Sequence, residues 1–359
     1  MKQLRVVVVM PPATDLDHEA ALDLWPTFTK TLEALRERGD IEPIGCCRTS
    51  RAAALIVARN GVDYHFEPSD RQLAQRVAGL HPDVVHLHGL GFTRVLVAIR
   101  RAVGRDVPIL MQHHGDPPPS TTRARLARRI TRHMVDGYLF TGAAGQAEAF
   151  RRVGAIRRTA QVHEVLESAS HLDASAMVEA PELGGNPRVV WVGRLIPSKD
   201  PLCAVQAVAA ARRLGSDAEL HMVATDRTME AEVRQLIESL GLAERVHLHP
   251  PVAHTAMVGW YRSADVYLST SHREGSNYSL IEALGFGCRP VVTEIPSHAA
   301  IVKELARRFP VGDSETAGAL IAAAAATSPD AVVEHASRHL SWGSITDELA
   351  TAYAQRRRT

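Results

Sequence analysis

Two carboxylates, Glu274 and Glu282, flank a short polar stretch in the sequence HREGSNYSLIEALGFGCRP. Residues 275–277 form a predicted turn, and residues 279–286 have the pattern of a helix. A helix that begins at such a turn directs backbone N–H groups and the positive end of its dipole outward, where an anion such as a diphosphate binds well. Glu282 lies one turn inside the helix, within reach of ligand hydroxyls, and Glu274 can face a second group.

Each carboxylate also has a purely structural explanation. Ser279-Leu-Ile-Glu282 fits the S-x-x-E capping box, in which both side chains only satisfy the helix end. Glu274 can instead be a solvated loop carboxylate paired with Arg273. The spacing alone leaves a structural and a ligand-binding role open for Glu282.

Two cations follow an apolar strand in RVVWVGRLIPSKDP. The strand ends at Gly193, and Arg194 and Lys199 lie on the loop before a helix that begins after Asp200-Pro201. An Asp at the N-cap followed by Pro in the first turn is a common helix start. Two cations and a helix N-terminus can neutralise a diphosphate leaving group without a metal ion. The alternative is a pair of surface cations on a loop.

Short apolar, β-branched runs recur along the chain, separated by segments long enough for helices. Continuous apolar strands that alternate with helices indicate buried parallel sheets. The strands predicted in the first half are residues 4–10, 42–47, 83–88, 108–114, 137–141 and 161–166. Those predicted in the second half are residues 188–193, 218–224, 245–249, 265–270 and 289–293.

The two series predict an α/β protein with two doubly wound, Rossmann-like domains facing each other across a cleft. The first domain should span residues 1–168, followed by a Ser-, Ala-, Gly- and Pro-rich linker at 169–186. The second domain should span residues 187–340, and the C-terminal helix 341–359 should pack back onto the first. Ligands bind beyond the carboxyl ends of parallel strands, which is where the residues described above are expected.

Composition and charge restrict the class of protein. The 359 residues carry a formal net charge of +1, which argues against a nucleic-acid binder driven by bulk charge. The four cysteines, at positions 46, 47, 203 and 288, lack CxxC spacing and are expected to be buried free thiols in a reducing compartment. No stretch approaches the about 20 apolar residues that span a bilayer. We therefore expect a cytoplasmic protein that can at most rest on a membrane surface.

The motifs around these residues resemble those of one family. VGRLIPSKDP, followed by YRSADVYLSTSHREGSNYSLIEALGFGCRPVVT, is similar to the nucleotide-sugar domain of retaining glycosyltransferases with the GT-B fold, in particular family 4, group 1. The E-x7-E pattern of Glu274 and Glu282 and the G-R-x4-K pattern that ends at Lys199 are its signatures. The resemblance covers about residues 187–303, and the first domain only through HPDVVHLHG, ILMQHHG and DGYLFTGAAGQAEAFRRVG.

The resemblance implies a role for each of the residues at the strand ends. Arg194 and Lys199 would hold the diphosphate, and Glu282 would bind the ribose hydroxyls of the donor. Glu274 would lie beside the donor sugar and stabilise an oxocarbenium-like transition state, without being securely a nucleophile. Backbone groups around Val252 would meet the base. The other binding positions are those whose amides would contact phosphate and sugar, namely Gly275, Ser276, Asn277, Tyr278, Ser279 and Leu280.

The same resemblance assigns a catalytic histidine to the first domain. His114, in QHHG, matches the family's strand-end histidine, which faces the donor. The neighbouring His113 is the alternative if the motif is aligned one residue off. Closure of the two domains would then assemble the site.

These roles imply a metal-independent hexosyltransferase that moves a sugar from a UDP- or GDP-sugar donor to a hydroxyl acceptor with retention of anomeric configuration. The leaving diphosphate can itself accept the acceptor's proton, so the protein mainly positions groups and stabilises charge. No tightly bound cofactor is implied, and the acceptor, on the side of the first domain, can be a small molecule, a saccharide or a lipid-linked group. Two alternatives stay open: a GT-B sugar-nucleotide epimerase, and a catalytically silent nucleotide-sugar-binding partner protein.

The chain departs from the family at several loops. The loop MPPATDLDHEAALDLWP after the first strand lacks the usual Gly-Gly, so no acceptor residue is assigned. Ala224-Thr225 and Pro250-Pro251 replace glycines near the expected base site. The usual Asn-Gly segment between the domains reads VLESASHLD. None of these changes removes the cations or the glutamate pair.

Three other patterns have simpler explanations. Asp15-Leu-Asp17 is a DxD, the metal–nucleotide signature of the GT-A fold, but so short a pattern often occurs by chance. The pairs His86/His88 and His247/His249 are expected to be satisfied strand-end histidines, because no acidic partner has convincing ligand spacing. The basic helix 121–134 can lie on an anionic membrane surface. Alternatively, its stripe of Leu126, Ala127, Ile130 and Met134 faces the core.

Overall fold

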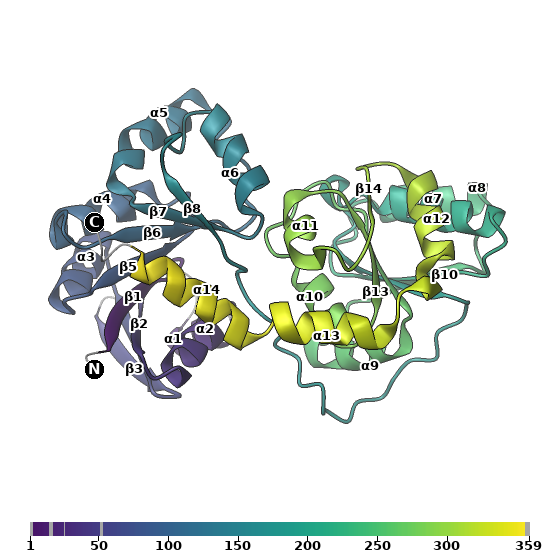
Figure 1. Ribbon diagram of the computed structural model, residues 1–359, viewed down its shortest axis with the longest axis horizontal. Helices are drawn as coiled ribbons and strands as arrows, with labels where there is room; N and C mark the ends of the chain where they lie inside the picture. The colour runs from purple at the N-terminus through teal and green to yellow at the C-terminus, as the bar shows by residue number, and fades with distance from the viewer. Residues whose placement is uncertain (1–2, 14–16, 25, 51–52, 356–359) are drawn as a thin grey trace. The chain divides into compact units, whose positions relative to one another are not determined.

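The computed structural model describes residues 3–13, 17–24, 26–50 and 53–355. The chain forms two compact units, Met1–Ser168 with Trp342–Thr359, and Ala169–Ser341. In each unit, helices flank a sheet (Figure 1). Asp15 of the DxD pattern and the last four residues of the C-terminal segment lie outside the described residues.

The first unit is built on an eight-stranded sheet with the order β3-β4-β2-β1-β5-β6-β7-β8. Its strands are β1 (Leu4–Val9), β2 (Ile41–Arg48), β3 (Leu55–Arg59), β4 (Val62–Glu67), β5 (Val84–His88), β6 (Ile109–Gln112), β7 (Gly137–Phe140) and β8 (Gln161–Glu164). The ladders are parallel except for β3–β4. The apolar run of β1 is almost fully buried, as expected for a central strand covered by helices on both faces.

The β3–β4 hairpin is an element that we did not predict from the sequence. Its two-residue loop, Asn60-Gly61, has φ values of 51° and 76°. A tight hairpin turn of this type needs positive φ at both positions, which Asn and Gly tolerate best.

The helices of the first unit are α1 (His18–Leu24), α2 (Pro26–Glu37), α3 (Asp70–Gly79), α4 (Thr93–Val103), α5 (Thr122–Thr131), α6 (Ala143–Arg152) and α14 (Trp342–Ala354), with a 3-10 turn η1 (Arg132–Met134). The C-terminal α14 packs against α2. Its fully buried Tyr353 places the hydroxyl 2.8 Å from Nδ1 of His86 on β5.

The second unit has a six-stranded parallel sheet with the order β11-β10-β9-β12-β13-β14. Its strands are β9 (Arg188–Gly193), β10 (Glu219–Ala224), β11 (Val246–His249), β12 (Val266–Ser269), β13 (Arg289–Thr293) and β14 (Arg308–Phe309). The chain order reverses between β9 and β12, which makes their carboxyl ends the topological switch point where open α/β sheets bind ligands.

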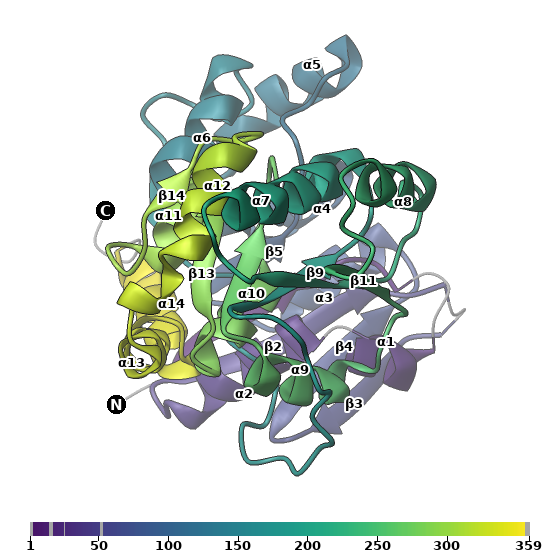
Figure 2. The same ribbon diagram turned by 90° about the vertical axis from the view of Figure 1, so that its right-hand side faces the viewer.

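The helices of the second unit are α7 (Pro201–Arg213), α8 (Glu230–Ser239), α9 (Met257–Ser263), α10 (Tyr278–Gly285), α11 (Pro296–Val302), α12 (Ser314–Ala322) and α13 (Pro329–His339), with 3-10 turns η2 (Pro197–Lys199), η3 (His254–Ala256) and η4 (Ala324–Ala326). Helices α7, α8 and α12 cover one face of the sheet, and α9 lies on the other side (Figure 2). A Cβ at Gly318 of α12 would lie 2.5 Å from Cβ of Ala210, so glycine lets α12 pack closely on the alanine-rich α7.

All of the predicted strands are present, although several are shorter by one or two residues at an end. The four cysteines are buried free thiols, as expected. No helix among the described residues is long and apolar enough to cross a membrane.

The apolar stripe of the basic helix 121–134 does not face the core as a whole, so the interpretation of this stripe as core-facing is wrong. Leu126 and Ile130 on α5 are 58% and 61% exposed, whereas Arg128 and Thr131 are buried. Burial lowers the pKa of Arg128 to about 10. The inward face of α5 is therefore polar, and its outward face carries Leu126 and Ile130 among exposed arginines.

Candidate functional site

The loops that follow β9 and β12 are tied together at the switch point. The hydroxyl of Thr270, just after β12, lies 2.8 Å from the carbonyl oxygens of both Lys199 and Asp200. The same hydroxyl accepts the indole N–H of Trp191 on β9 at 3.2 Å. These contacts fix the position of Lys199 relative to the end of the neighbouring strand.

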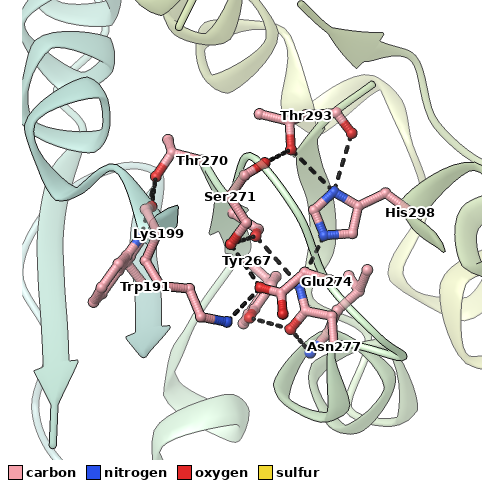
Figure 3. Close-up of polar contacts among 11 residues, drawn as sticks. Trp191, Lys199, Tyr267, Thr270, Ser271, Glu274, Asn277, Thr293 and His298 are labelled. Atoms are coloured by element: carbon pink, nitrogen blue, oxygen red, sulfur yellow. Dashed lines mark hydrogen bonds and ion pairs between the residues drawn. The ribbon is translucent and has the colours of Figure 1, made fainter. Parts of the chain in front are cut away.

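Lys199 and Glu274 form an ion pair at this point (Figure 3). Their side chains are 19% and 11% exposed, and Ser271 donates a hydrogen bond of 2.6 Å to the carboxylate. Glu274 is therefore not a solvated carboxylate paired with Arg273, and that alternative is wrong. Arg194, the other predicted cation, lies directly after β9 and is exposed.

Asp200 closes the loop that carries Lys199. It caps α7, accepting from the N–H of Cys203 at 3.1 Å, with Pro201 in the first turn, which confirms the predicted helix start. Its other oxygen lies 2.8 Å from Nε2 of His272 in the loop that carries Glu274. A helix cap thus supplies a further contact between the two loops.

Helix α10 begins at Tyr278, with Asn277 as its N-cap (φ 38°). The Asn277 side chain points inward, with its Nδ2 3.2 Å from Oγ of Ser269 and 2.9 Å from Nε2 of His298. It therefore fixes the helix start and is not directed at a ligand. The amide of Leu280 is bonded to Asn277, so this amide is not available to a phosphate in the present arrangement.

Among the other predicted turn positions, Ser276 is buried, and Gly275, Tyr278 and Ser279 are partly buried. They lie in the loop and first turn at the positive end of the helix dipole.

His298, which we did not identify from the sequence, supports this loop. Its ring is fully buried, and burial lowers its pKa to about 4. Its Nδ1 lies 3.0 Å from the carbonyl oxygen of Thr293, which can only accept, so the proton is on Nδ1 and Nε2 accepts from Asn277. A neutral histidine thus anchors the start of α10 to the end of β13.

Glu282 does not form the capping box, so that structural alternative is wrong. Its carboxylate is 5% exposed and lies 2.6 Å from Nε2 of His254 and 3.2 Å from the hydroxyl of Tyr261. His254 was not predicted, since it lies 28 residues upstream. It follows Val252 by two residues, so the contact joins α10 to the loop where the base is expected.

The pair of His254 and Glu282 makes stability depend on pH. The hydrogen bond to Glu282 raises the pKa of His254 above its usual value of 6.5. A raised pKa gives stability that is complete below about 6.5 and is lost as pH rises through the folded-state value. In urea unfolding, His254→Ala should therefore lower the free energy of unfolding by about 0.5–1 kcal/mol at about pH 6 and by less at about pH 9. The surface variant His133→Ala should show no such difference, and an equal cost of His254→Ala at both pH values would contradict the prediction.

His114 belongs to the first unit, beyond the end of β6. Its ring is partly exposed and bonded to Glu167 and His88. The alternative, His113, is buried, stacks on Phe140 and bonds the carbonyl oxygen of Asp116. Of the two, only His114 is partly exposed to solvent.

One group of histidines and a glutamate in the second unit has the spacing of a metal site. Glu219, His221 and His247 place one possible ligand atom each within 4.8 Å of the others, so an acidic partner does accompany these histidines. However, His247 bonds Glu219 at 3.0 Å and Arg245 holds the other carboxylate oxygen at 2.8 Å. His221 donates to the carbonyl oxygen of Gly184 and accepts from His249, and burial lowers the pKa of both rings. The side chains of these three residues are therefore all engaged in hydrogen bonds within the protein.

Comparison with known proteins gives a family match within the second unit. Residues 186–338 match the family model described as glycosyl transferases group 1. A D-inositol 3-phosphate glycosyltransferase of Mycolicibacterium gilvum (strain PYR-GCK) is 27% identical over 208 residues, which cover 54% of this chain and 46% of that protein. The matches span less than half the length of the first curated relatives.

Solved structures resemble the whole chain. A glycosyltransferase from Rickettsia africae ESF-5 superposes with a TM-score of 0.73 at 12% identity over 100% of both chains. Anabaena Alr3699/HepE in complex with UDP and glucose gives a TM-score of 0.65 at 13% identity, covering 98% of this chain and 100% of that chain. These similarities confirm the predicted α/β fold with two Rossmann-like domains, the GT-B fold.

Proposed function

With residues 186–338 as a glycosyl transferases group 1 domain, we propose that this protein transfers a sugar from a nucleoside diphosphate to an acceptor hydroxyl, with retention of anomeric configuration. The observation that carries the proposal is the Lys199–Glu274 pair at the switch point, beside the start of α10. A cation and helix-terminal amides suit a diphosphate, and a shielded carboxylate suits sugar hydroxyls.

In the proposed reaction, the donor diphosphate replaces Glu274 as the ion-pair partner of Lys199. Arg194 adds a second positive charge beside the diphosphate. The bond between the anomeric carbon and the diphosphate oxygen breaks, and the acceptor oxygen bonds to the same face of that carbon. The acceptor's proton passes to the departing diphosphate oxygen. Glu274 stabilises the positive charge that develops on the sugar ring, and the two cations stabilise the leaving group, so the charge balance needs no metal ion.

The substrate classes follow from the relatives. A UDP-sugar donor is supported by the Anabaena neighbour, whose structure contains UDP and glucose, and a GDP-sugar is the alternative. The inositol 3-phosphate named for the mycobacterial relative supports a hydroxyl acceptor that carries an anionic group. In this proposal, residues 187–340 bind the donor, 169–186 link the domains and 1–168 receive the acceptor. Glu282 binds the ribose, and backbone groups around Val252 meet the base.

A donor screen followed by product analysis tests the function. Thermal shifts with UDP, GDP and ADP identify the base, and mass spectrometry with the matching nucleotide sugar then follows transfer to a panel of acceptors. Proton NMR of the product's anomeric signal tests retention. Conversion of the donor without any acceptor would indicate the epimerase, and donor binding without turnover would indicate a silent binding protein.

We further propose that the acceptor is reached at an anionic membrane surface through the basic helix 121–134. Leu126 and Ile130 are exposed on α5 beside the exposed arginines 123, 125 and 129. Apolar groups inserted below a layer of cations are the means by which such helices bind anionic lipids.

The double variant Leu126→Gln/Ile130→Gln should bind vesicles of phosphatidylglycerol and phosphatidylcholine about 30-fold more weakly, since each side chain loses about 1 kcal/mol of insertion. Vesicle sedimentation at low and high salt measures this. Leu214→Gln, at an exposed leucine of the second unit, is the control and should bind as the wild type does. Equal binding by all three proteins would refute the membrane contact.

A further inference from the structure

Two buried side chains hold the ring of His114 from both sides. Its Nδ1 lies 2.7 Å from Oε2 of Glu167, whose side chain is 5% exposed. Its Nε2 lies 2.9 Å from Nδ1 of His88, a residue that is 2% exposed. Phe28 packs against both imidazoles in T-shaped arrangements, with ring centroids 4.6 Å from His88 and 5.6 Å from His114. The ring of His114 is thus fixed in position and plane.

The hydrogen bonds also determine where the protons lie. The Glu167 carboxylate accepts, so His114 carries a proton on Nδ1. Burial keeps the pKa of His88 well below 6.5, so His88 is neutral with one ring proton. The ring proton of His88 can form a hydrogen bond only if it is on Nδ1, which faces His114. Nε2 of His88 has no hydrogen-bond partner among the residues that the structure describes. His88 therefore donates to Nε2 of His114, which is an acceptor.

We propose that Glu167 is the positioning residue of His114: its carboxylate fixes the ring as the Nδ1–H tautomer and leaves Nε2 as the acceptor for a substrate hydroxyl, which replaces His88 as donor. The role of the substrate rests on the proposed function, whereas the tautomer does not. Glu167 lies in VLESASHLD, where this chain lacks the Asn-Gly typical of the resembled family. The departure from the family motif thus supplies the carboxylate. A carboxylate that orients a catalytic imidazole in this way acts through the histidine and does not touch the substrate.

Long-range ¹H–¹⁵N NMR of protein labelled only at histidine tests the tautomer. His114→Asn identifies the His114 signals by their loss. In the wild type, Nδ1 should carry the proton and Nε2 should not. In Glu167→Gln, whose amide can also donate, a substantial share of His114 should change to the Nε2–H tautomer. Glu164→Gln, a neutralised glutamate three residues away, should leave the pattern unchanged. An identical His114 pattern in Glu167→Gln and the wild type would overturn the proposal.

Kinetics separate positioning from a general loss of structure. Glu167→Gln should lower kcat by about 10²-fold with donor KM changed less than about threefold, as expected when the histidine that accepts a hydrogen bond from a substrate hydroxyl is misplaced. Glu167→Asp, which keeps the charge on a shorter side chain, should keep the wild-type tautomer and more of the activity. If Glu167→Gln does not fold, the wild type alone tests the tautomer, and a proton on Nε2 of His114 in the wild type would overturn the proposal. If Glu167→Gln changes the tautomer but turns over at the wild-type rate, Glu167 is not a positioning residue. A wild type that shows the tautomer but no transfer with any donor would instead refute the proposed function.

Discussion

Glu274→Gln is expected to lower kcat by about 10²- to 10³-fold, because a neutral amide cannot stabilise the positive charge that develops on the sugar ring. The folded structure should survive, since glutamine keeps the shape of the side chain and can still accept from Ser271. Lys199 loses its partner but is 19% exposed, so its charge retains contact with water. Steady-state turnover at saturating donor, with product measured by mass spectrometry, gives the change in kcat.

A matched variant separates this effect from a general loss of negative charge. Glu238→Gln neutralises an exposed glutamate of α8 in the same unit and should leave kcat unchanged. Thermal unfolding of both variants should stay within a few degrees of the wild type, which corresponds to about 1 kcal/mol. A Glu274→Gln protein that folds normally and turns over at nearly the wild-type rate would remove Glu274 from the site.

Much of the framework could be predicted because its pattern is local. Apolar, β-branched runs mark the strands of both sheets, and residues at their carboxyl ends must gather at one edge. Asp200-Pro201 marks the start of α7 by capping chemistry alone. The β3–β4 hairpin was missed although Asn60-Gly61, the usual dipeptide of such turns, stands between its strands. The two-residue β14 is too short to give any periodicity.

The side-chain partners of the site could not be predicted, because each joins segments far apart in the chain. Lys199 meets Glu274 across 75 residues, and His254 meets Glu282 across 28. The capping box at Ser279 was a plausible local pattern, but Asn277 takes the N-cap in its place. Asn277 tolerates the left-handed backbone of this turn. Its side chain is hydrogen-bonded to His298, and no local sequence pattern reveals that contact. Whether a carboxylate caps a helix or faces a ligand is decided by such tertiary contacts.

Lys199→Ala is expected to reduce kcat/KM by about 10³-fold, because it removes a cation from the leaving diphosphate in both the bound and the transition state. The loss should appear in binding as well as in turnover. One charge-assisted hydrogen bond is worth about 1.5–3 kcal/mol, which corresponds to about 10- to 100-fold weaker UDP or GDP binding. Lys30→Ala, which removes a half-exposed lysine of the first unit, should change neither value.

The ion pair gives the two site variants opposite effects on the nucleotide alone. In the free protein, Glu274 is the ion-pair partner of Lys199. A diphosphate that binds Lys199 must therefore displace the Glu274 carboxylate and lie next to its negative charge. Glu274→Gln should therefore bind UDP or GDP a few-fold more tightly than the wild type, whereas Lys199→Ala binds more weakly. Isothermal titration of the nucleotide that the donor screen selects measures both, and Glu274→Gln should tighten binding less in the Lys199→Ala background than in the wild type, because the competition for the lysine exists only while Lys199 is present. Weaker binding by Glu274→Gln would mean that the carboxylate assists the diphosphate site, and that the two residues are partners in binding and not competitors.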